Sequence, residues 1–292
     1  MDTARTALLT DRGVVRVTGP DAAKLLQGLV TNDMDHLATL PAIHAGLLAP
    51  QGKILFDFFV VRAGDGFLLE TAADKTGELA KRLLLYRLRA KVEIVDVTAE
   101  HAVAVQWGGT RPPESLPGVI VFADPRLPAL GWRMILQAPA DPAAMTAGAA
   151  DYEAHRVALG VPEGGKDFKL GDTFPHEADY DQLGGVSFTK GCYVGQEVVS
   201  RMAHRTTVRK RVVPIAAEGT LHPGSEIRIG EAVIGAVGSV AGEHALALVR
   251  LDRAAEALAK GLAITVDGTP VTVIKPDWAT FDINPQKPTE PA

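Results

Sequence analysis

The sequence lacks the features that mark several large classes of protein. It contains a single cysteine, Cys192, so this chain alone can form no intramolecular disulfide and no multi-cysteine zinc or iron–sulfur site. No run of 18 apolar residues occurs, and residues 1–6 hold no apolar core of the signal-peptide kind. Lys and Arg number 30 against 35 Asp and Glu, a net charge of −5 that disfavours binding of nucleic acid over the whole surface. We therefore expect a soluble cytoplasmic protein with no membrane partner and no metal site of its own.

The remaining composition and patterning predict an α+β protein with a strand-rich end. Apolar residues make up 47% and charged residues 22% of the 292 residues, which is typical of ordered globular chains. The apolar run at residues 54–61 predicts a strand covered on both faces, and residues 75–90 predict an amphipathic helix. After residue 205, short apolar runs alternate with Gly-rich turns, which predicts a small antiparallel barrel. Asp267-Gly268 is a strong hairpin signal within it.

The middle of the chain is less regular. Residues 102–105 and 132–136 predict strands, and residues 141–159 predict a helix with Pro142 at its beginning. Residues 161–189 are rich in Gly, Asp and Pro and predict a long loop. A loop of that length in a compact domain is usually functional.

The run Lys-Gly-Cys-Tyr-Val-Gly-Gln-Glu at residues 190–197 is the most unusual segment. A short helix over residues 196–203 would place Cys192 near a helix amino end, and both the helix dipole and Lys190 would favour a thiolate. The alternative is a small buried apolar cysteine. Tyr193 fits either stacking on a ligand ring or packing in the core.

Three further sites carry charge. Asp57 interrupts the apolar run, so it either faces water from an edge strand or lies at the wall of an apolar pocket, where it would accept hydrogen bonds from a flat heterocycle. Glu177 lies in the long loop. Basic residues cluster at Lys190, Arg201, Arg205 and the run 209–211. The run 209–211 is typical of a solvated strand face, and the whole cluster could alternatively receive an anionic tail.

These motifs resemble the YgfZ-type folate-binding proteins, relatives of the glycine-cleavage aminomethyltransferase. The run at 190–197 is similar to their K-G-C-[FY]-x-G-Q-E signature. Further matching segments lie at residues 19–21, 26–33, 51–53, 174–178 and 183–190. The resemblance covers most of the chain except about residues 102–150.

The resemblance implies a fold and a ligand. The expected fold is a three-subdomain cloverleaf of the aminomethyltransferase type around a central channel, with a C-terminal antiparallel β-barrel. It predicts a folate-binding region of two subdomains at residues 1–206, the barrel at 207–284 and a flexible tail at 285–292. Tetrahydrofolate is the expected cofactor, with Glu177, Asp57, Tyr193, Gln196 and Arg201 on the binding side. Lys190 and Cys192 are the expected reactive residues at the channel mouth.

The family role implied is support of iron–sulfur cluster assembly or repair, with folate and iron–sulfur client or assembly proteins as partners. Asp57 matches the second acid of an Asp-Asp pair in the aminomethyltransferases, and Phe56 replaces the first. This replacement argues against the glycine-cleavage reaction and leaves it uncertain whether the chain is an enzyme. The alternative is a folate-dependent aminomethyl or one-carbon transferase. A third hypothesis is an RNA-modification partner that uses residues 208–212, although the net acidity disfavours nucleic acid.

Overall fold

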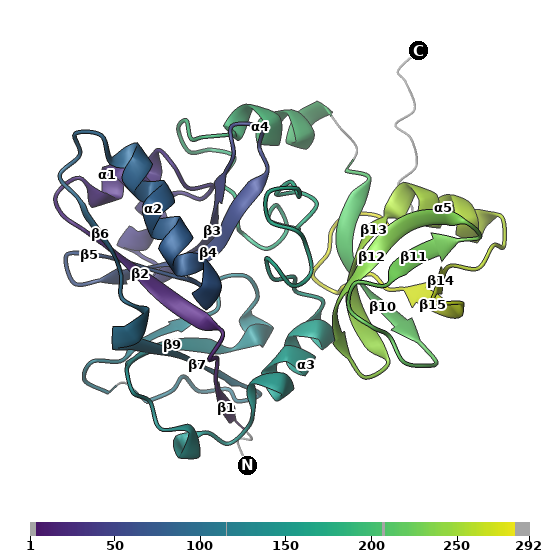
Figure 1. The fold of residues 1–292 in the computed structure, drawn as a ribbon, viewed down its shortest axis with the longest axis horizontal. Coiled ribbons are helices and arrows are strands. Elements are labelled where there is room, and N and C mark those ends of the chain that lie inside the picture. The colour runs from purple at the N-terminus through teal and green to yellow at the C-terminus, as the bar shows by residue number, and fades with distance from the viewer. Residues whose placement is uncertain (1–3, 115, 206–207, 284–292) are drawn as a thin grey trace. The chain divides into compact units, whose positions relative to one another are not determined.

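The computed structural model describes residues 4–283 apart from residues 115 and 206–207. The chain divides into two compact units, the first comprising Met1–Tyr152 with Leu183–Gln196 and the second Glu153–Gln182 with Glu197–Ala292. Figure 1 shows the elements of each unit along the chain. The predicted domain limits at residues 206 and 284 stay a prediction, and the predicted tail at 285–292 lies outside the described residues.

The first unit contains two antiparallel sheets. The five-stranded sheet has the order β3-β4-β5-β2-β6 and the four-stranded sheet the order β1-β7-β9-β8. The strands of the five-stranded sheet are β2 (Arg12–Thr18), β3 (Ala42–Leu48), β4 (Ile54–Ala63), β5 (Gly66–Ala72) and β6 (Glu93–Asp96). Those of the four-stranded sheet are β1 (Arg5–Leu8), β7 (His101–Trp107), β8 (Ile120–Ala123) and β9 (Trp132–Gln137).

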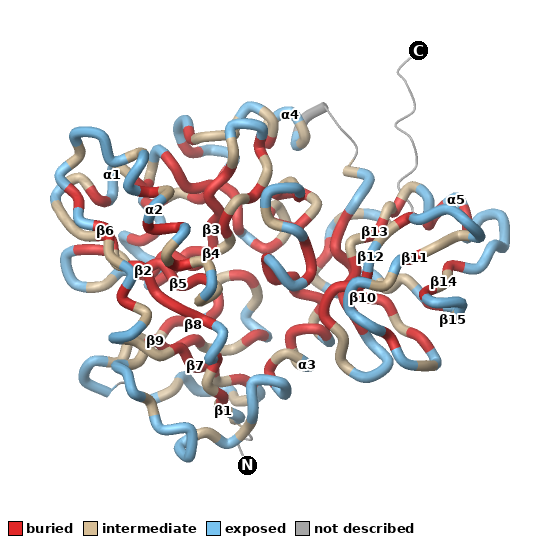
Figure 2. The backbone as a smooth tube through the Cα atoms, in the orientation of Figure 1, coloured by how far each residue is buried: buried red, intermediate tan, exposed pale blue. Residues whose placement is uncertain are grey.

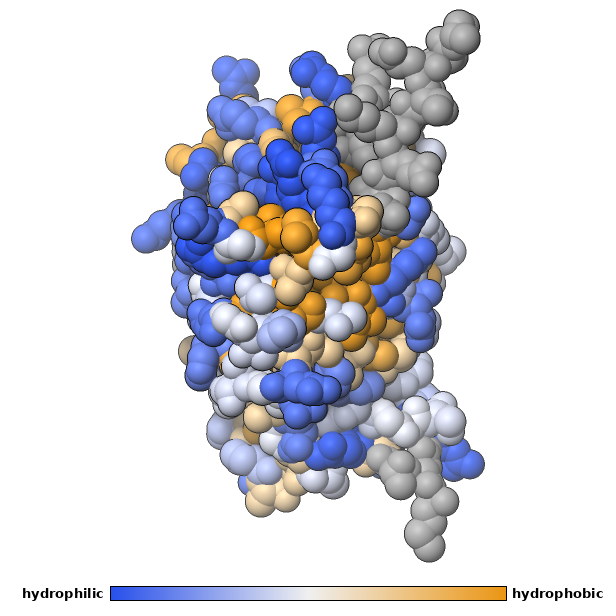
Figure 3. All heavy atoms as spheres, turned by 90° about the vertical axis from the view of Figure 1, so that its right-hand side faces the viewer, coloured by the Kyte–Doolittle hydropathy of each residue, from blue (hydrophilic) through white to orange (hydrophobic). Residues whose placement is uncertain are grey.

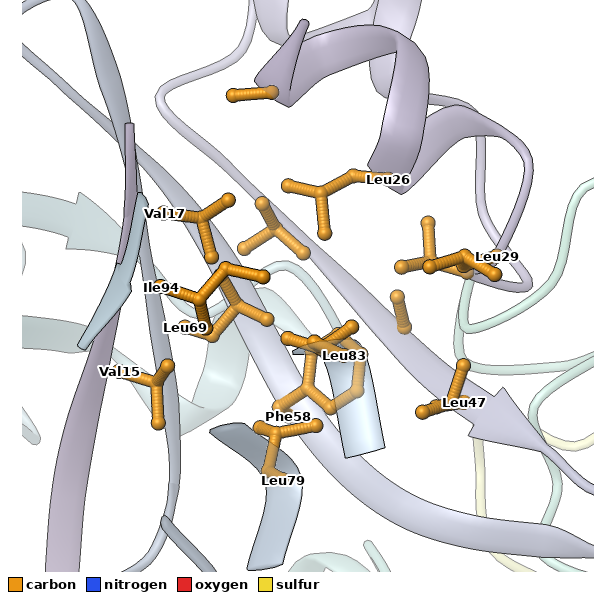
Figure 4. Packing of buried hydrophobic residues seen from close by; sticks show 14 of the residues in the cluster. Val15, Val17, Leu26, Leu29, Leu47, Phe58, Leu69, Leu79, Leu83 and Ile94 are labelled. Atoms are coloured by element: carbon orange, nitrogen blue, oxygen red, sulfur yellow. The ribbon is translucent and has the colours of Figure 1, made fainter. Parts of the chain in front are cut away.

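One face of the five-stranded sheet packs against helices α1 (Ala22–Gln27) and α2 (Thr76–Arg87). Leu26 on α1 and Leu79 and Leu83 on α2 meet Phe58 and the apolar strand residues in a single cluster (Figure 4). Strand β4 lies between β3 and β5, and residues on both of its faces are buried over 58–61, whereas Leu55 and Asp57 are half-buried (Figure 2). The prediction of a strand covered on both faces is confirmed, because charged and aromatic groups cover its other face.

That other face carries a buried ionic cluster that joins the two sheets. Glu70 on β5 is fully buried and accepts from Arg133 Nε of β9 at 2.8 Å and from Arg12 Nε of β2 at 2.8 Å. The guanidinium of Arg133 also lies 4.6 Å from the centroid of the Phe59 ring. The two Arg partners hold the pKa of Glu70 below its ordinary value of 4.5, although burial alone would raise it.

The second unit is built around a closed antiparallel barrel with the order β10-β13-β12-β11-β14-β15. Its strands are β10 (Lys210–Ala217), β11 (Glu226–Ile229), β12 (Ala232–Ala241), β13 (His244–Arg250), β14 (Thr265–Val266) and β15 (Thr269–Val273). Asp267 and Gly268 join β14 to β15 with φ values of 48° and 83°, as a two-residue hairpin of this composition requires. The predicted α+β class with a C-terminal antiparallel barrel is confirmed.

The remaining helices are α3 (Ala149–Leu159), α4 (Gln196–Arg205) and α5 (Leu251–Ala259). The predicted helix at 141–159 is too long, since only its second part is α-helical. Neither α5 nor the strands β1, β3 and β8 were predicted from the sequence. Apolar side chains gather on the face of the molecule in Figure 3. The barrel unit has an open groove of about 450 Å³ lined in part by Val233, Ile234 and Leu262. No helix among the described residues combines the length and apolarity that crossing a bilayer requires.

Candidate functional site

The site in the first unit begins with a histidine–carboxylate pair on two neighbouring strands. In the register of β3 and β4, His44 lies opposite Phe59 and Gly46 opposite Asp57. The His44 ring reaches diagonally to Asp57, with Nε2 2.7 Å from Oδ1. His44 is buried and Asp57 half-buried, so this carboxylate keeps some access to a ligand. Because β4 is an interior strand, the alternative of an edge strand with Asp57 facing water is wrong.

Asn32 connects this pair to the loop that carries the cysteine. Its Nδ2 donates to the carbonyl of His44 at 2.9 Å and to that of Gly184 at 2.7 Å. The neighbouring Thr31 Oγ1 donates to the carbonyl of Gly185 at 2.6 Å and accepts from the Gly46 amide at 2.8 Å. Residues 31–32 therefore bind strand β3 to the loop at 184–185.

Lys190 fixes the same loop further along. Its Nζ donates to the carbonyls of Val30 at 2.8 Å and Asn32 at 2.7 Å, and lies 5.2 Å from the centroid of the Tyr193 ring. Burial lowers the pKa of Lys190 from 10.5 to about 8 and raises that of Tyr193 to about 12. Lys190 is thus a buried anchor, and the predicted reactive role at a channel mouth stays a prediction.

Cys192 lies in the loop between the buried residues Lys190 and Tyr193. It is exposed, so the alternative of a buried apolar cysteine is wrong. Gly195 allows the loop to turn close to the sheet, with a φ of 84° that disfavours other residues. A Cβ at this position would lie 2.7 Å from the carbonyl oxygen of Ala49. Tyr193 is buried and Gln196, the first residue of α4, is half-buried. The loop therefore holds an accessible thiol on a backbone fixed on both sides.

We expect Lys190→Met to lower the free energy of unfolding at pH 7 by about 1–3 kcal/mol, because two buried carbonyls lose their donor. The lowered pKa of Lys190 means that, between about pH 8 and 10.5, the unfolded chain binds more protons at this residue than the folded chain. Its contribution to stability consequently increases with pH across that window. Urea unfolding from pH 7 to 10.5 measures both effects. Lys24→Met, at an exposed position, is the control, and equal pH slopes for wild type and Lys190→Met would contradict the prediction.

The other predicted binding residues belong to the second unit. Glu177 is half-buried, and its Oε2 accepts from the Phe174 amide at 2.9 Å, so one carboxylate oxygen closes a local turn. The carbonyl of Glu177 accepts from the Val212 amide at 3.0 Å. Arg201 lies exposed on α4. Their predicted roles toward folate stay predictions.

Part of the expected basic face is buried. Arg209 and Lys210 are exposed, whereas Arg211 points into the unit and pairs with Asp179 and Asp181 at 2.8 Å each. The solvated-face interpretation is wrong for Arg211, because its side chain is buried in contact with these two carboxylates and the His176 carbonyl. Among the described residues, no group of three or more His, Cys, Asp and Glu side chains has an arrangement that could hold a metal ion.

Sequence reasoning missed His44 and the role of Asn32. A lone His within an apolar strand is a weak signal, and an Asn after a helix is commonly a cap or turn residue. Only the pairing of β3 with β4 and the return of the chain at residue 183 bring these side chains to Asp57 and Lys190.

Two family models match separate parts of the chain. Residues 9–111 match the GCVT N-terminal domain, and residues 209–281 match the CAF17 C-terminal beta-barrel domain. The aminomethyltransferase T of the glycine cleavage system from Bartonella henselae has a similar structure, with a TM-score of 0.72 over 94% of this chain and 86% of that one. Its sequence is 14% identical, so the likeness establishes the fold. The predicted aminomethyltransferase-type fold is confirmed.

Curated relatives bear the name iron–sulfur cluster assembly factor IBA57, mitochondrial. The Mus musculus protein is 35% identical over 92% of this chain and 84% of its own length, and the Homo sapiens protein 36% over 80% and 72%. A homologue from Mycosarcoma maydis is 36% identical over 76% of this chain, which spans 60% of that protein. These names contradict the expected cytoplasmic location, since they place the relatives in mitochondria. By its identity to the mouse and human proteins over most of their length, the chain belongs to the IBA57 family of iron–sulfur cluster assembly factors.

Proposed function

We propose that this chain is a tetrahydrofolate-binding accessory protein that supports iron–sulfur cluster assembly in client enzymes, as the YgfZ-type resemblance implies. The observation that carries the proposal is the linkage in the first unit, where Asn32 joins the His44–Asp57 pair to the loop presenting Cys192. A ligand-accessible carboxylate and an exposed thiol are thereby held by one hydrogen-bonded framework.

The residues fit a reduced pterin. The ring of tetrahydrofolate carries neighbouring N–H and amino donors, which pair with a carboxylate acceptor. The Asp57 side chain is 11% exposed and is held by His44 from the side, so it is fixed before a ligand binds. When bound, a reduced folate supplies a one-carbon acceptor nitrogen. Asp57 would orient it, while His44 keeps the carboxylate in place and Cys192 offers its sulfur at the surface.

The position of Phe56 shows that residue 56 lies on the face opposite Asp57, so its side chain does not reach the ligand side. Successive residues of a strand point to opposite faces, so Asp57 lies on the ligand side and Phe56, 1% exposed, packs in the apolar cluster beneath the helices. A second acid at residue 56 would enter that core rather than join Asp57. This chain therefore has one carboxylate from β4 where the transferase pattern has a pair.

We expect Asp57→Asn to weaken tetrahydrofolate binding about 10- to 100-fold, because charged acceptors contribute about 1.5–3 kcal/mol each. Anaerobic isothermal titration calorimetry with tetrahydrofolate measures the change. Asp65→Asn, exposed in the turn that follows β4, is the matched control and should bind as wild type does. Equal affinities for Asp57→Asn and wild type would remove Asp57 from the binding site.

The alternative function is a one-carbon transferase, favoured by the retained Asp57 and its pairing with His44. Formation of methylenetetrahydrofolate from a lipoyl-bound aminomethyl group would establish it. The absence of product, together with tetrahydrofolate binding, would support the accessory role.

A further inference from the structure

The end of α2 and the turn after it form a surface that the proposed function does not use. We call it the basic-leucine surface. It comprises Lys81, Arg82, Leu84, Leu85, Arg87, Leu88, Arg89 and Lys91. Residues 81–91 contain five cations and no acid, in a chain whose formal net charge is −5. Within the described parts of the chain, none of the five cations forms an ion pair. The surface is therefore a local positive area on an acidic protein.

Three leucines lie exposed among these cations. Leu84, Leu85 and Leu88 have 41%, 70% and 88% of their surface accessible. The helix does not need them for its own packing, since Leu79 and Leu83 fill the core side of α2 (Figure 4). The helix thus has a second apolar edge with nothing over it in the described structure.

The backbone conformation of Leu88 is the strongest indication that this apolar edge has a function. Its φ of 46° and ψ of −109° lie in a region that bulky residues rarely adopt, directly after the last residue of α2. Such strain persists where the surrounding structure or a function requires it. Here the strained residue is an almost fully exposed leucine, which gains no burial within its own chain.

We propose that the basic-leucine surface docks a protein partner that presents an apolar groove with an acidic rim. Apolar anchors surrounded by residues that exclude water are the usual centre of a protein interface. The unpaired cations around Leu85 and Leu88 would complement acidic groups at the rim and orient the partner.

The side chains favour a protein over RNA or a membrane. Single-stranded nucleic acid is bound by exposed aromatic rings on which bases stack, and Tyr86 instead packs partly buried against the core. Helices that lie in a membrane interface bury a long apolar face in lipid. The long apolar face of α2 is occupied by the sheet, which leaves three leucines near one end.

This surface and the candidate folate site lie on opposite faces of the five-stranded sheet. Helix α2 covers the face of Phe58, whereas Asp57 points from the other. A partner on the basic-leucine surface and a ligand at Asp57 can therefore be bound at the same time. An experiment can refute the docking proposal without refuting the folate proposal, and the reverse.

The first test replaces Leu85 or Leu88 by a photo-crosslinking amino acid in the full chain in cells, with mass spectrometry of the crosslinked peptides. Leu40, 48% exposed in the same unit and outside the surface, is the control position. We expect positions 85 and 88 to crosslink to one identified protein, at an apolar segment flanked by Asp or Glu, and position 40 not to do so. Crosslinks to RNA or lipid, or the same crosslinks from position 40, would overturn the proposal.

The second test uses that purified protein. The double variant Arg87→Glu with Arg89→Glu should weaken binding at least 10-fold, and reversal of the mapped acids to Lys should restore it. Leu88→Gly should also weaken binding about 10-fold while raising the Tm by about 2–4 °C, because glycine relieves the strained backbone. Undiminished binding by either variant would refute the docking site. Tetrahydrofolate titration of the double variant should match wild type, which separates this proposal from the folate site.

Discussion

Glu70→Gln is expected to lower the free energy of unfolding of the first unit by about 3–5 kcal/mol, because it removes the carboxylate that two buried guanidinium groups share. Among the described residues, Arg133 then keeps only Asp124, at 3.5 Å, as a countercharge. Glu70 is 0% exposed and binds Arg12 and Arg133 from two different sheets. Glutamine keeps the shape and one acceptor oxygen but removes the charge. Because the two sheets meet at this side chain, the substitution should mainly weaken the packing of one sheet against the other.

The measurement is urea unfolding followed by tryptophan fluorescence in a Trp278→Phe background, where Trp107 and Trp132 report only the first unit. The lowered pKa of Glu70 means that its stabilisation is complete above its unfolded value of about 4.5 and is lost as pH falls through the folded value. The variant should therefore lose less stability than wild type in acid. Glu78→Gln, exposed on α2, should change stability by less than about 0.5 kcal/mol, and a similarly small change for Glu70→Gln would contradict the ionic cluster as a structural element.

The second large effect concerns function. Cys192→Ser should abolish the support of iron–sulfur enzymes in cells that lack the endogenous protein, with enzyme activities falling to those of cells carrying no gene. The side chain is exposed, so the variant should fold with a Tm within about 1 °C of wild type and bind tetrahydrofolate unchanged. Loss of iron–sulfur enzyme activity with an unchanged Tm and unchanged tetrahydrofolate binding would show that the sulfur of Cys192 is required for the function.

Gly191→Ala is the matched control for the same loop. A Cβ at Gly191 would meet no atom within 4 Å, so this variant changes the residue next to the thiol without moving the backbone. It should retain full activity. If Cys192→Ser also retained full activity, the cysteine would have no part in the function, and only the proposed folate site would remain as a functional site.

The sequence predicted the elements whose signals are local. The apolar run of β4, the core face of α2 and the Asp267-Gly268 hairpin each follow from a few consecutive residues. Helix α5 also had a signal, the helical spacing of the apolar residues Leu251, Ala254 and Ala255. The strand pattern of the preceding residues concealed the change from a two-residue to a helical period.

The candidate site was less predictable because its contacts are distant along the chain. The run at 190–197 and Asp57 stand out in the sequence itself, whereas the hydrogen bond from Lys190 Nζ to the Val30 carbonyl spans 160 residues and leaves no pattern. Likewise, three adjacent cations at 209–211 look alike in sequence, and only the folded structure separates the buried Arg211 from its exposed neighbours. The positive φ of Leu88 follows from no rule of composition.

The order in which the chain visits its two units has a consequence for biosynthesis. Residues up to Tyr152 form most of the first unit, the chain then builds part of the second, and Leu183–Gln196 returns to complete the first. A nascent chain on the ribosome can thus pair its two sheets well before the cysteine is translated. Gly46 and Asn32, whose neighbourhood binds the loop, are then already folded. The segment that carries Cys192 packs onto them later.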